Sequence, residues 1–172
     1  MDWLWELILA AVLATALRMM VFTLARVEGV SMQDTLRTGD CLLATRLDAL
    51  LRAPRRGSVV LCRYPGTRKC FVKRLIGLPG DTLELRGGAM YINGAPVREP
   101  YVRHAALRGF GPVTLGDGEY FVMGDNRARS RDSRAVGPLS RRQITAVVRL
   151  RVWPPRRAGR IRVQPPAPDG SI

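Results

Sequence analysis

The sequence predicts a mainly β protein: one compact antiparallel β-sheet or partial-barrel domain, with one N-terminal transmembrane helix. Three observations predict this. An apolar segment opens the chain, short segments with β-type alternation follow, and no long helical period occurs between Ser31 and Trp153. A chain of 172 residues suits one ordinary domain plus an anchor. We therefore divide it into a membrane anchor (1–26), a β domain (27–153) and a tail (154–172).

The apolar N-terminal segment extends to residue 25, and its uninterrupted core is residues 7–17. A core of this length suits a signal-peptide core or a buried helix better than a full membrane span. However, Trp3 and Trp5 lie where an interfacial aromatic belt would be, and Arg18 can extend its charge to the membrane surface. The acidic start of the chain also differs from the basic start of a cleaved signal peptide. We expect an anchor, either as one span or as a shallow insertion.

Short β-type segments account for the expected sheet. In chain order they are Cys41–Thr45, Val59–Cys62, Phe71–Ile76, Thr82–Leu85, Ala89–Ile92, Glu119–Met123 and Ile144–Val152. The strongest hairpin signal is Asn93-Gly94, because both residues tolerate the positive φ that a two-residue turn requires. Residues 102–117 are predicted to be an insert or loop. The tail, rich in Pro and Arg, has no core-forming pattern and is predicted to be disordered or loosely membrane-associated.

The charge balance is strongly basic, with 28 Lys and Arg against 14 Asp and Glu, for a net charge of +14. Such a balance favours an anionic partner, either nucleic acid or an anionic membrane surface. The arginines are spread along the chain and aromatic residues make up only 6%, whereas a nucleic-acid site would need a concentrated patch with interleaved aromatics. We therefore expect the lipid bilayer as a partner and no nucleic acid.

Cysteine and histidine usage argues against several kinds of site. Cys41, Cys62 and Cys70 are odd in number, lack metal-ligand spacing and lie among apolar residues. They indicate buried free thiols and no disulfide framework, although their pairing stays open. His104 is the single histidine and is expected in a surface loop, which argues against a Ser/His/Asp triad. No sequence cluster resembles a zinc site, and we expect no metal and no cofactor.

The central chemical feature is Lys73, which interrupts the apolar strand 71–76 just before the turn at Pro79–Asp81. A buried lysine must find a partner or lose its proton, because desolvation disfavours the charged form. A neutral lysine is a competent general base near pH 7, and it can activate a serine such as Ser31 without histidine. The alternative is that Lys73 alternates outward into solvent.

Three ordered motifs carry a family resemblance. They are Ser31-Met32-Gln33-Asp34-Thr35-Leu36, the segment Lys73–Asp81 and the segment Gly124–Arg134. On these residues the chain resembles the type I signal peptidases, which are membrane-bound Ser/Lys proteases, over about residues 3–152. The last two motifs match the family pattern fully. The first departs from it at Asp34, where the family has proline, and a carboxylate here would stabilise protonated Lys73 and oppose its role as a base.

The resemblance implies roles for the motif residues. Ser31 would be the nucleophile, Lys73 the general base, and Ser130 the hydroxyl that orients the lysine. The walls of the substrate-binding pockets would come from Met32, Leu36, Phe71 and Val72. Structural support for the site would come from Asp125, Asn126, Arg127, Asp132 and Arg134, and Gly124 would allow close backbone approach. The alternatives are a loop cap for Ser130 and ordinary core packing for the four apolar residues.

The resemblance also implies preproteins with N-terminal signal peptides as partners. The location would be the cell membrane, single-pass, with the catalytic domain on the extracytoplasmic side. The positive-inside rule conflicts with this orientation, because the arginine-rich C-terminal part would lie in the cytoplasm. Two other functions stay open. One is another Ser/Lys peptidase, such as a plasmid-transfer peptidase. The other is a catalytically silent, membrane-tethered binding module, with Asp34 as the sign of lost activity.

Overall fold

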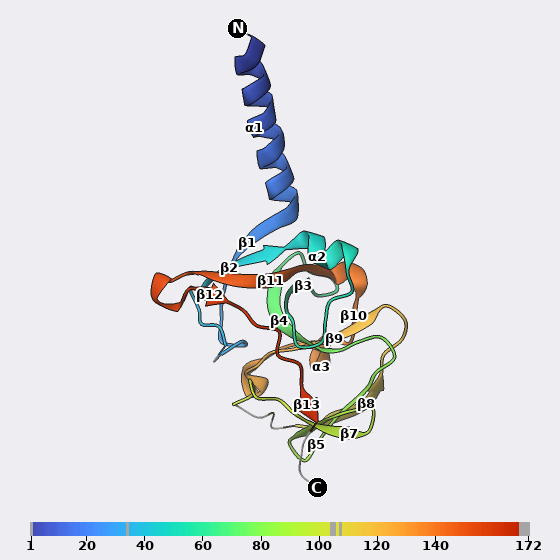
Figure 1. The fold of residues 1–172 in the computed structure, drawn as a ribbon. Coiled ribbons are helices and arrows are strands. Elements are labelled where there is room, and N and C mark those ends of the chain that lie inside the picture. The colour runs from blue at the N-terminus through green and yellow to red at the C-terminus, as the bar shows by residue number, and fades with distance from the viewer. Residues whose placement is uncertain (1, 34, 104–105, 107, 169–172) are drawn as a thin grey trace.

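The computed structural model describes residues 2–33, 35–103, 106 and 108–168, without the side chains of residues 2 and 16–20. Most of its elements are strands, and one helix projects from the body (Figure 1). The helices are α1 (Asp2–Val21), α2 (Arg46–Leu51) and α3 (Ser133–Val136). Short 3-10 helices occur at η1 (Arg127–Arg129), η2 (Arg141–Gln143) and η3 (Pro155–Arg157).

The first sheet combines strands from both ends of the chain. Its eight strands run in the order β1-β2-β11-β3-β4-β9-β10, with β12 paired to β11, and every pairing is antiparallel. The strands are β1 (Phe22–Arg26), β2 (Cys41–Thr45), β3 (Val59–Arg63), β4 (Cys70–Gly77), β9 (Glu119–Met123), β10 (Leu139–Ser140), β11 (Ile144–Trp153) and β12 (Gly159–Arg160). This arrangement brings the N-terminal and C-terminal parts of the domain side by side.

The second sheet lies at the end of the molecule opposite α1 (Figure 1). Its five strands run in the order β13-β7-β6-β5-β8, again antiparallel throughout. They are β5 (Thr82–Arg86), β6 (Ala89–Ile92), β7 (Ala95–Arg98), β8 (Phe110–Thr114) and β13 (Ala167–Pro168). The predicted hairpin turn joins β6 to β7, with Asn93 at φ 54° and Gly94 at φ 78°.

Three apolar clusters form the core. Alternate residues of β3 belong to different clusters, Val60 to the first and Leu61 to the second, so these two clusters cover opposite faces of the first sheet. The third cluster joins the two sheets, because it contains Phe121 of the first sheet and Leu83 of the second. The prediction of a mainly β, antiparallel fold is confirmed, and all seven predicted strand segments form.

The N-terminal segment differs from the expected helix at its C-terminal end. The helix ends at Val21, and all five residues of β1 pair with β2, from Phe22 opposite Thr45 to Arg26 opposite Cys41. The sequence did not indicate this strand, because its apolar residues continue the composition of the helix. Among the residues that the structure describes, no helix is long and apolar enough to cross a membrane.

Two segments expected to lack regular structure contain strands. Within 102–117, β8 pairs with β5 because glycines allow close approach: a Cβ at Gly109 would lie 2.4 Å from the Leu85 carbonyl oxygen. Within the tail, residues 154–168 include η3, β12 and β13 and lie against both sheets. The regular structure of both segments depends on pairing with strands far away in the sequence, and a local sequence pattern does not reveal such partners.

The packing between the sheets generates a stability prediction at Gly77. A Cβ at this position would lie 2.5 Å from Cδ1 of Leu83 and 2.7 Å from Cδ1 of Leu115. We expect Gly77→Ala to lower the free energy of unfolding by about 1–3 kcal/mol through overpacking. Denaturant unfolding followed by circular dichroism measures this. Gly159→Ala is the matched control, because its Cβ would meet no atom within 4 Å, and equal stability of the two variants would contradict the prediction.

Candidate active site

The amine of Lys73 lies inside the protein. Lys73 stands opposite Val60 in the β3–β4 pairing and has only 3% of its surface exposed. Its Nζ lies 2.6 Å from Oγ of Ser31 and 3.2 Å from Oγ of Ser130. The alternative in which Lys73 points into solvent is therefore wrong. The structure places the Lys73 amine within hydrogen-bond distance of both serines that were predicted as catalytic.

Ser31 is carried by the loop between β1 and β2, whose two ends are joined. At the base of this loop the Val27 N–H donates to the Asp40 carbonyl at 2.8 Å. Beside the serine, the Asn126 N–H donates to the Ser31 carbonyl at 3.1 Å. The serine is thus positioned both by its own loop and by the segment that follows β9.

Ser130 is oriented by its neighbour Asp132. The Asp132 carboxylate accepts hydrogen bonds from the Gly124 N–H at 3.0 Å and from Arg134 at 2.8 Å to each oxygen. Burial alone would raise the pKa of Asp132, but these bonds, the Arg134 charge and a bond from the Ser130 hydroxyl outweigh it and hold the pKa below its usual value. The Ser130 oxygen lies 3.2 Å from Nζ of Lys73 and can accept from it, which leaves the hydroxyl proton free to turn toward Asp132.

Close packing requires glycine at position 124. A Cβ on Gly124 would lie 2.3 Å from Oγ of Ser130 and 2.4 Å from the Ser31 carbonyl oxygen. Both contacts are shorter than a Cβ can tolerate, and one is to backbone. Gly124 therefore allows the two polar loops to meet at Lys73.

Burial lowers the pKa of Lys73, because the ammonium group would lose its hydration. Asp132, the Cys62 thiol and Asp125 act in the opposite direction, whereas Arg134 adds to the lowering. Burial is the largest of these effects, so the amine is easier to deprotonate than an exposed lysine. A lysine in this state fits the task of a general base.

A fully buried ion pair lies directly behind Lys73. Nε and the NH2 nitrogen of Arg74 lie 2.8 and 2.7 Å from the two oxygens of Asp125, and both side chains have no exposed surface. The Thr35 hydroxyl donates to the same carboxylate at 2.5 Å, which ties the loop of Ser31 to the pair. A supporting role was predicted for Asp125 from the sequence, but not for Arg74 or Thr35. Both could have been found from their positions within the motifs, because Arg74 directly follows Lys73 and Thr35 comes four residues after Ser31.

The other residues predicted to support the site make contacts within the loop after β9 and with Glu99. Arg127 forms two hydrogen bonds of 2.6 Å with Glu99 and donates to the Gly124 carbonyl at 3.1 Å. The Asn126 side chain accepts a hydrogen bond from the Arg129 N–H at 3.2 Å. These contacts fix the loop after β9, and the role of Glu99 was not indicated by the sequence.

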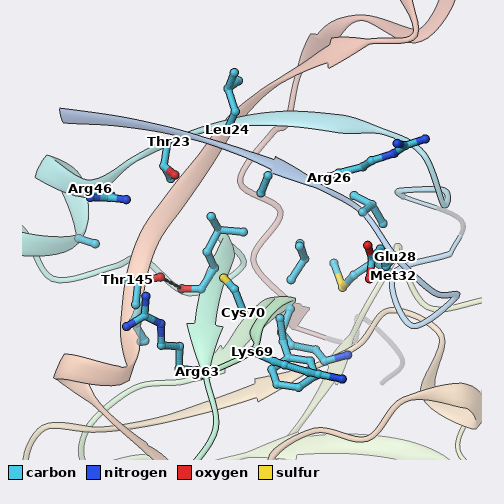
Figure 2. Close-up of a pocket in the computed structure, with 18 of the residues that line it drawn as sticks. Thr23, Leu24, Arg26, Glu28, Met32, Arg46, Arg63, Lys69, Cys70 and Thr145 are labelled. Atoms are coloured by element: carbon cyan, nitrogen blue, oxygen red, sulfur yellow. Dashed lines mark hydrogen bonds between the residues drawn. The ribbon is translucent and has the colours of Figure 1, made fainter. Parts of the chain in front are cut away.

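A cleft of about 1020 Å³ is lined by both Ser31 and Lys73. Figure 2 shows other side chains around it, among them Met32 and Cys70. Its walls come from β1, α2, β3, the start of β4, η2 and the start of β11. The predicted site residues that line it are Ser31, Met32, Phe71, Val72 and Lys73. On its rim, Arg46, Arg63 and Lys69 are basic, and Glu28 lies on the side of β1 (Figure 2). The cleft can hold an extended peptide whose backbone passes Ser31.

Two expectations about side chains near the cleft are corrected. Leu36 has no exposed surface and packs in the second apolar cluster, outside the described lining of the cleft.

Cys70 is an exposed thiol that lines the cleft, because it lies at the edge of the sheet where β4 begins. Cys62 is buried, which raises its pKa to about 12, and Cys41 is half-buried. All three cysteines are free thiols.

Two residues that the sequence analysis singled out, Asp34 and His104, lie outside the described residues. The effect of Asp34 on the lysine therefore stays a prediction. Within the described part of the chain, no group of three His, Cys, Asp or Glu side chains is placed to hold a metal ion.

Comparisons with known proteins agree on one family. The family described as "Signal peptidase, peptidase S26" matches residues 1–153. Signal peptidase I of Bacillus licheniformis is 37% identical over 164 residues, which cover 89% of this chain and 88% of that protein. Signal peptidase I V of Bacillus subtilis (strain 168) is 34% identical over 160 residues, or 85% of this chain and 95% of that protein.

A solved structure is also similar. The crystal structure of a signal peptidase I from Enterococcus faecalis V583 superimposes with a TM-score of 0.51 at 32% sequence identity. The match covers 56% of this chain and 97% of that one. The antiparallel sheets described above thus match the fold of a signal peptidase.

The lowered pKa of Lys73 can be tested directly, because the chain contains only two lysines, Lys69 and Lys73. Lys69 is exposed and serves as an internal reference. In protein with isotope-labelled lysine, we expect NMR to give two titration curves, with that of Lys73 at the lower pH. An amine on Lys73 that titrates together with Lys69, or above it, would contradict the assignment of a buried, readily deprotonated base.

Proposed function

The chain belongs to the signal peptidase family, peptidase S26, a family of serine endopeptidases, and we propose that it cleaves signal peptides with Ser31 as nucleophile and Lys73 as general base. The observation that carries this proposal is the 2.6 Å distance from Nζ of Lys73 to Oγ of Ser31, at a lysine that is almost fully buried. A serine activated by an adjacent base is the common requirement of acyl-transfer peptidases.

In the proposed reaction the neutral amine of Lys73 accepts the hydroxyl proton of Ser31 while Oγ attacks the scissile carbonyl carbon. The resulting ammonium then gives this proton to the leaving amine, and the acyl group stays on Ser31 as an ester. Lys73 next takes a proton from water, the hydroxide attacks the ester, and the proton returns to Oγ of Ser31. During both steps Ser130 accepts a hydrogen bond from Lys73, and Asp132 stabilises the transient ammonium.

The oxyanion formed in each step needs donors already in position. The backbone N–H of Ser31 is the proposed first donor, because it belongs to the nucleophile itself and the carbonyl of the same peptide, that of Val30, accepts a hydrogen bond from the Gln33 N–H at 3.1 Å. Gly29, two residues earlier, has φ 86° and offers no side-chain donor. A backbone amide or a water molecule would supply the second hydrogen bond.

The substrate is proposed to bind as an added strand along β4. In the described structure, β3 pairs with β4 from Cys70 to Arg74, whereas the pairing with β9 begins only at Arg74. The other edge of β4 beside Phe71 and Val72 is therefore available to a peptide in the cleft. Small residues at substrate positions −1 and −3 would enter shallow apolar depressions formed by Met32, Phe71 and Val72.

A membrane location is proposed on the basis of one continuous apolar surface. Large apolar side chains are exposed along α1 and continue onto β1 and α2 at its base, and these three elements contact one another. Those on β1 and α2 are Phe22, Leu24, Leu47, Leu50 and Leu51. We propose that α1 anchors the chain and that the catalytic domain lies on the extracytoplasmic surface. A signal peptide could then keep its apolar core in the bilayer while its cleavage site reaches Ser31.

The peptidase proposal is tested with a preprotein that carries an Ala-x-Ala site, with product mass as the measurement. We expect cleavage directly after the site. Ser31→Ala and Lys73→Ala should each lower kcat on the order of 10³-fold or more, because each removes a member of the catalytic pair. Arg68→Ala, an exposed change in the turn before β4, is the control.

Each other outcome has a definite meaning. Cleavage that survives Lys73→Ala would place the general base elsewhere. Absence of cleavage by folded wild-type protein would favour the silent binding module and direct attention to Asp34.

The membrane proposal is tested by flotation of the full chain with vesicles. Leu9 and Leu13 are 59% and 60% exposed on α1. The double change Leu9→Glu and Leu13→Glu should sharply lower the vesicle-bound fraction, because a charged side chain at the bilayer centre costs about 2.5–3.5 kcal/mol. Ala95→Glu in the second sheet is the control for added charge. Equal flotation of the α1 variant and wild type would show that α1 is not the anchor.

A further inference from the structure

The C-terminal strap, which we define as Pro154–Pro168, runs from the first sheet to the second. Near its start β12 pairs with β11, with Gly159 opposite Arg151. At its end β13 pairs with β7, with Ala167 opposite Arg98. Between these two pairings the strap contacts residues that hold the active-site loops.

The first contact is at Asp40, at the base of the loop that carries Ser31. Asp40 has no exposed surface, and its carboxylate accepts a hydrogen bond from the Arg37 N–H at 3.0 Å. Arg157 of the strap forms an ion pair with the same carboxylate, and Arg151 of β11 lies 3.6 Å away. A buried carboxylate needs compensating charge, and here part of it comes from the strap.

The strap also directs Arg151 toward the loop. Nε of Arg151 donates to the Arg157 carbonyl, and its NH1 nitrogen donates to the Thr35 carbonyl at 3.2 Å. The hydroxyl of Thr35 in turn donates to Asp125 at 2.5 Å. A continuous set of hydrogen bonds thus leads from the strap through the Ser31 loop to the buried pair behind Lys73.

The second contact reaches the same pair from the opposite side. The Gln164 N–H donates to the Gly57 carbonyl at 3.2 Å, and that carbonyl also accepts from NH1 of Arg74 at 2.9 Å. The approach is so close that a Cβ on Gly57 would lie 2.3 Å from the Gln164 backbone. Arg74 directly follows Lys73 and holds Asp125.

From these contacts we propose that the C-terminal strap positions the active site, with Arg157 as a positioning residue that acts through Asp40. The inference rests on the proposed function, because the group it positions is the Ser31–Lys73 pair. Arg157 holds the base of the Ser31 loop closed, and the closed loop keeps Oγ at the lysine and keeps water away from it.

The effect on Lys73 acts through hydration. Among the described residues, the charged and titratable groups that face the Lys73 amine are Asp132, Asp125, Arg134 and Cys62, and none of them belongs to the strap. Removal of Arg157 therefore changes no charge next to Lys73. It loosens the loop, admits water, and so brings the pKa of Lys73 back up toward its ordinary value.

The test compares Arg157→Ala with Arg156→Ala in the full chain. Arg156 is the matched control, because it is an exposed arginine in the same turn. NMR titration of the two lysines should show a raised Lys73 pKa in Arg157→Ala only, with Lys69 unchanged. With the preprotein, kcat at pH 7 should fall about tenfold, because small displacements of reacting groups are costly.

Two further readouts separate positioning from simple loss of fold. The deficit in kcat should narrow at pH 9, where a larger fraction of Lys73 is neutral in the variant. KM should change less than about twofold, since the cleft walls come from other elements. A folded Arg157→Ala variant with the wild-type Lys73 titration and pH profile would overturn the inference.

A milder variant covers the case in which Arg157→Ala does not fold. Arg157→Gln keeps part of the side-chain packing and a hydrogen-bond donor, and it should shift the Lys73 pKa upward as well. An unshifted pKa in folded Arg157→Gln would then overturn the inference. Because the titration needs no substrate, failure of wild-type cleavage would reject the proposed function separately from the strap.

Discussion

The structure of the site depends on one constraint: an amine must be buried against a hydroxyl without a free carboxylate beside it. Two aspartates in the described part of the chain lie close enough to Lys73 to stabilise its ammonium form. Each is already paired, Asp132 with Arg134 and Asp125 with Arg74. The two arginines thereby leave burial as the dominant effect on the pKa of Lys73. The dense polar motif after β9 thus keeps both of these carboxylates paired with arginine rather than with Lys73.

This constraint explains why the site is assembled from distant segments. The serine comes from the loop after β1, the lysine from β4, and the orienting hydroxyl from the segment between β9 and β10. A buried ion pair is weak support for overall stability, but loss of one partner costs about 3–5 kcal/mol because it leaves an uncompensated charge. Pairs such as Arg74–Asp125 and Arg127–Glu99 therefore restrict the loops to one arrangement. A single loop arrangement matters more for the proposed reaction than for stability, because small displacements of reacting groups greatly slow a reaction.

Much of the fold and the site could be predicted from local pattern. Alternation along the chain and the Asn93-Gly94 turn located seven strands. The three motifs located Lys73 and the two serines that contact it, Ser31 and Ser130. The missed features all depend on partners distant in the sequence. β1 continues an apolar segment, β8 begins in a segment interrupted by Gly109, Gly111 and Pro112, and the strap is held by β11, β7, Asp40 and Gly57. Leu36 and Cys70 were misplaced because a motif gives the order of residues along the chain but not which face of a loop or strand edge is covered.

The two sheets have different relations to the site. The first sheet supplies the lysine and the serine loop, while the second contributes no residue to the described lining of the cleft. The second sheet nevertheless meets the site through three connections: Glu99 just after β7, Tyr101 stacked 4.0 Å from the Arg74 guanidinium, and β13 at the end of the strap. Glu99 binds Arg127, and the Tyr101 ring contacts Arg74. The strap that ends in β13 binds the Gly57 carbonyl. The second sheet therefore serves as a frame that closes the polar network behind Lys73, while the walls of the cleft come from other elements.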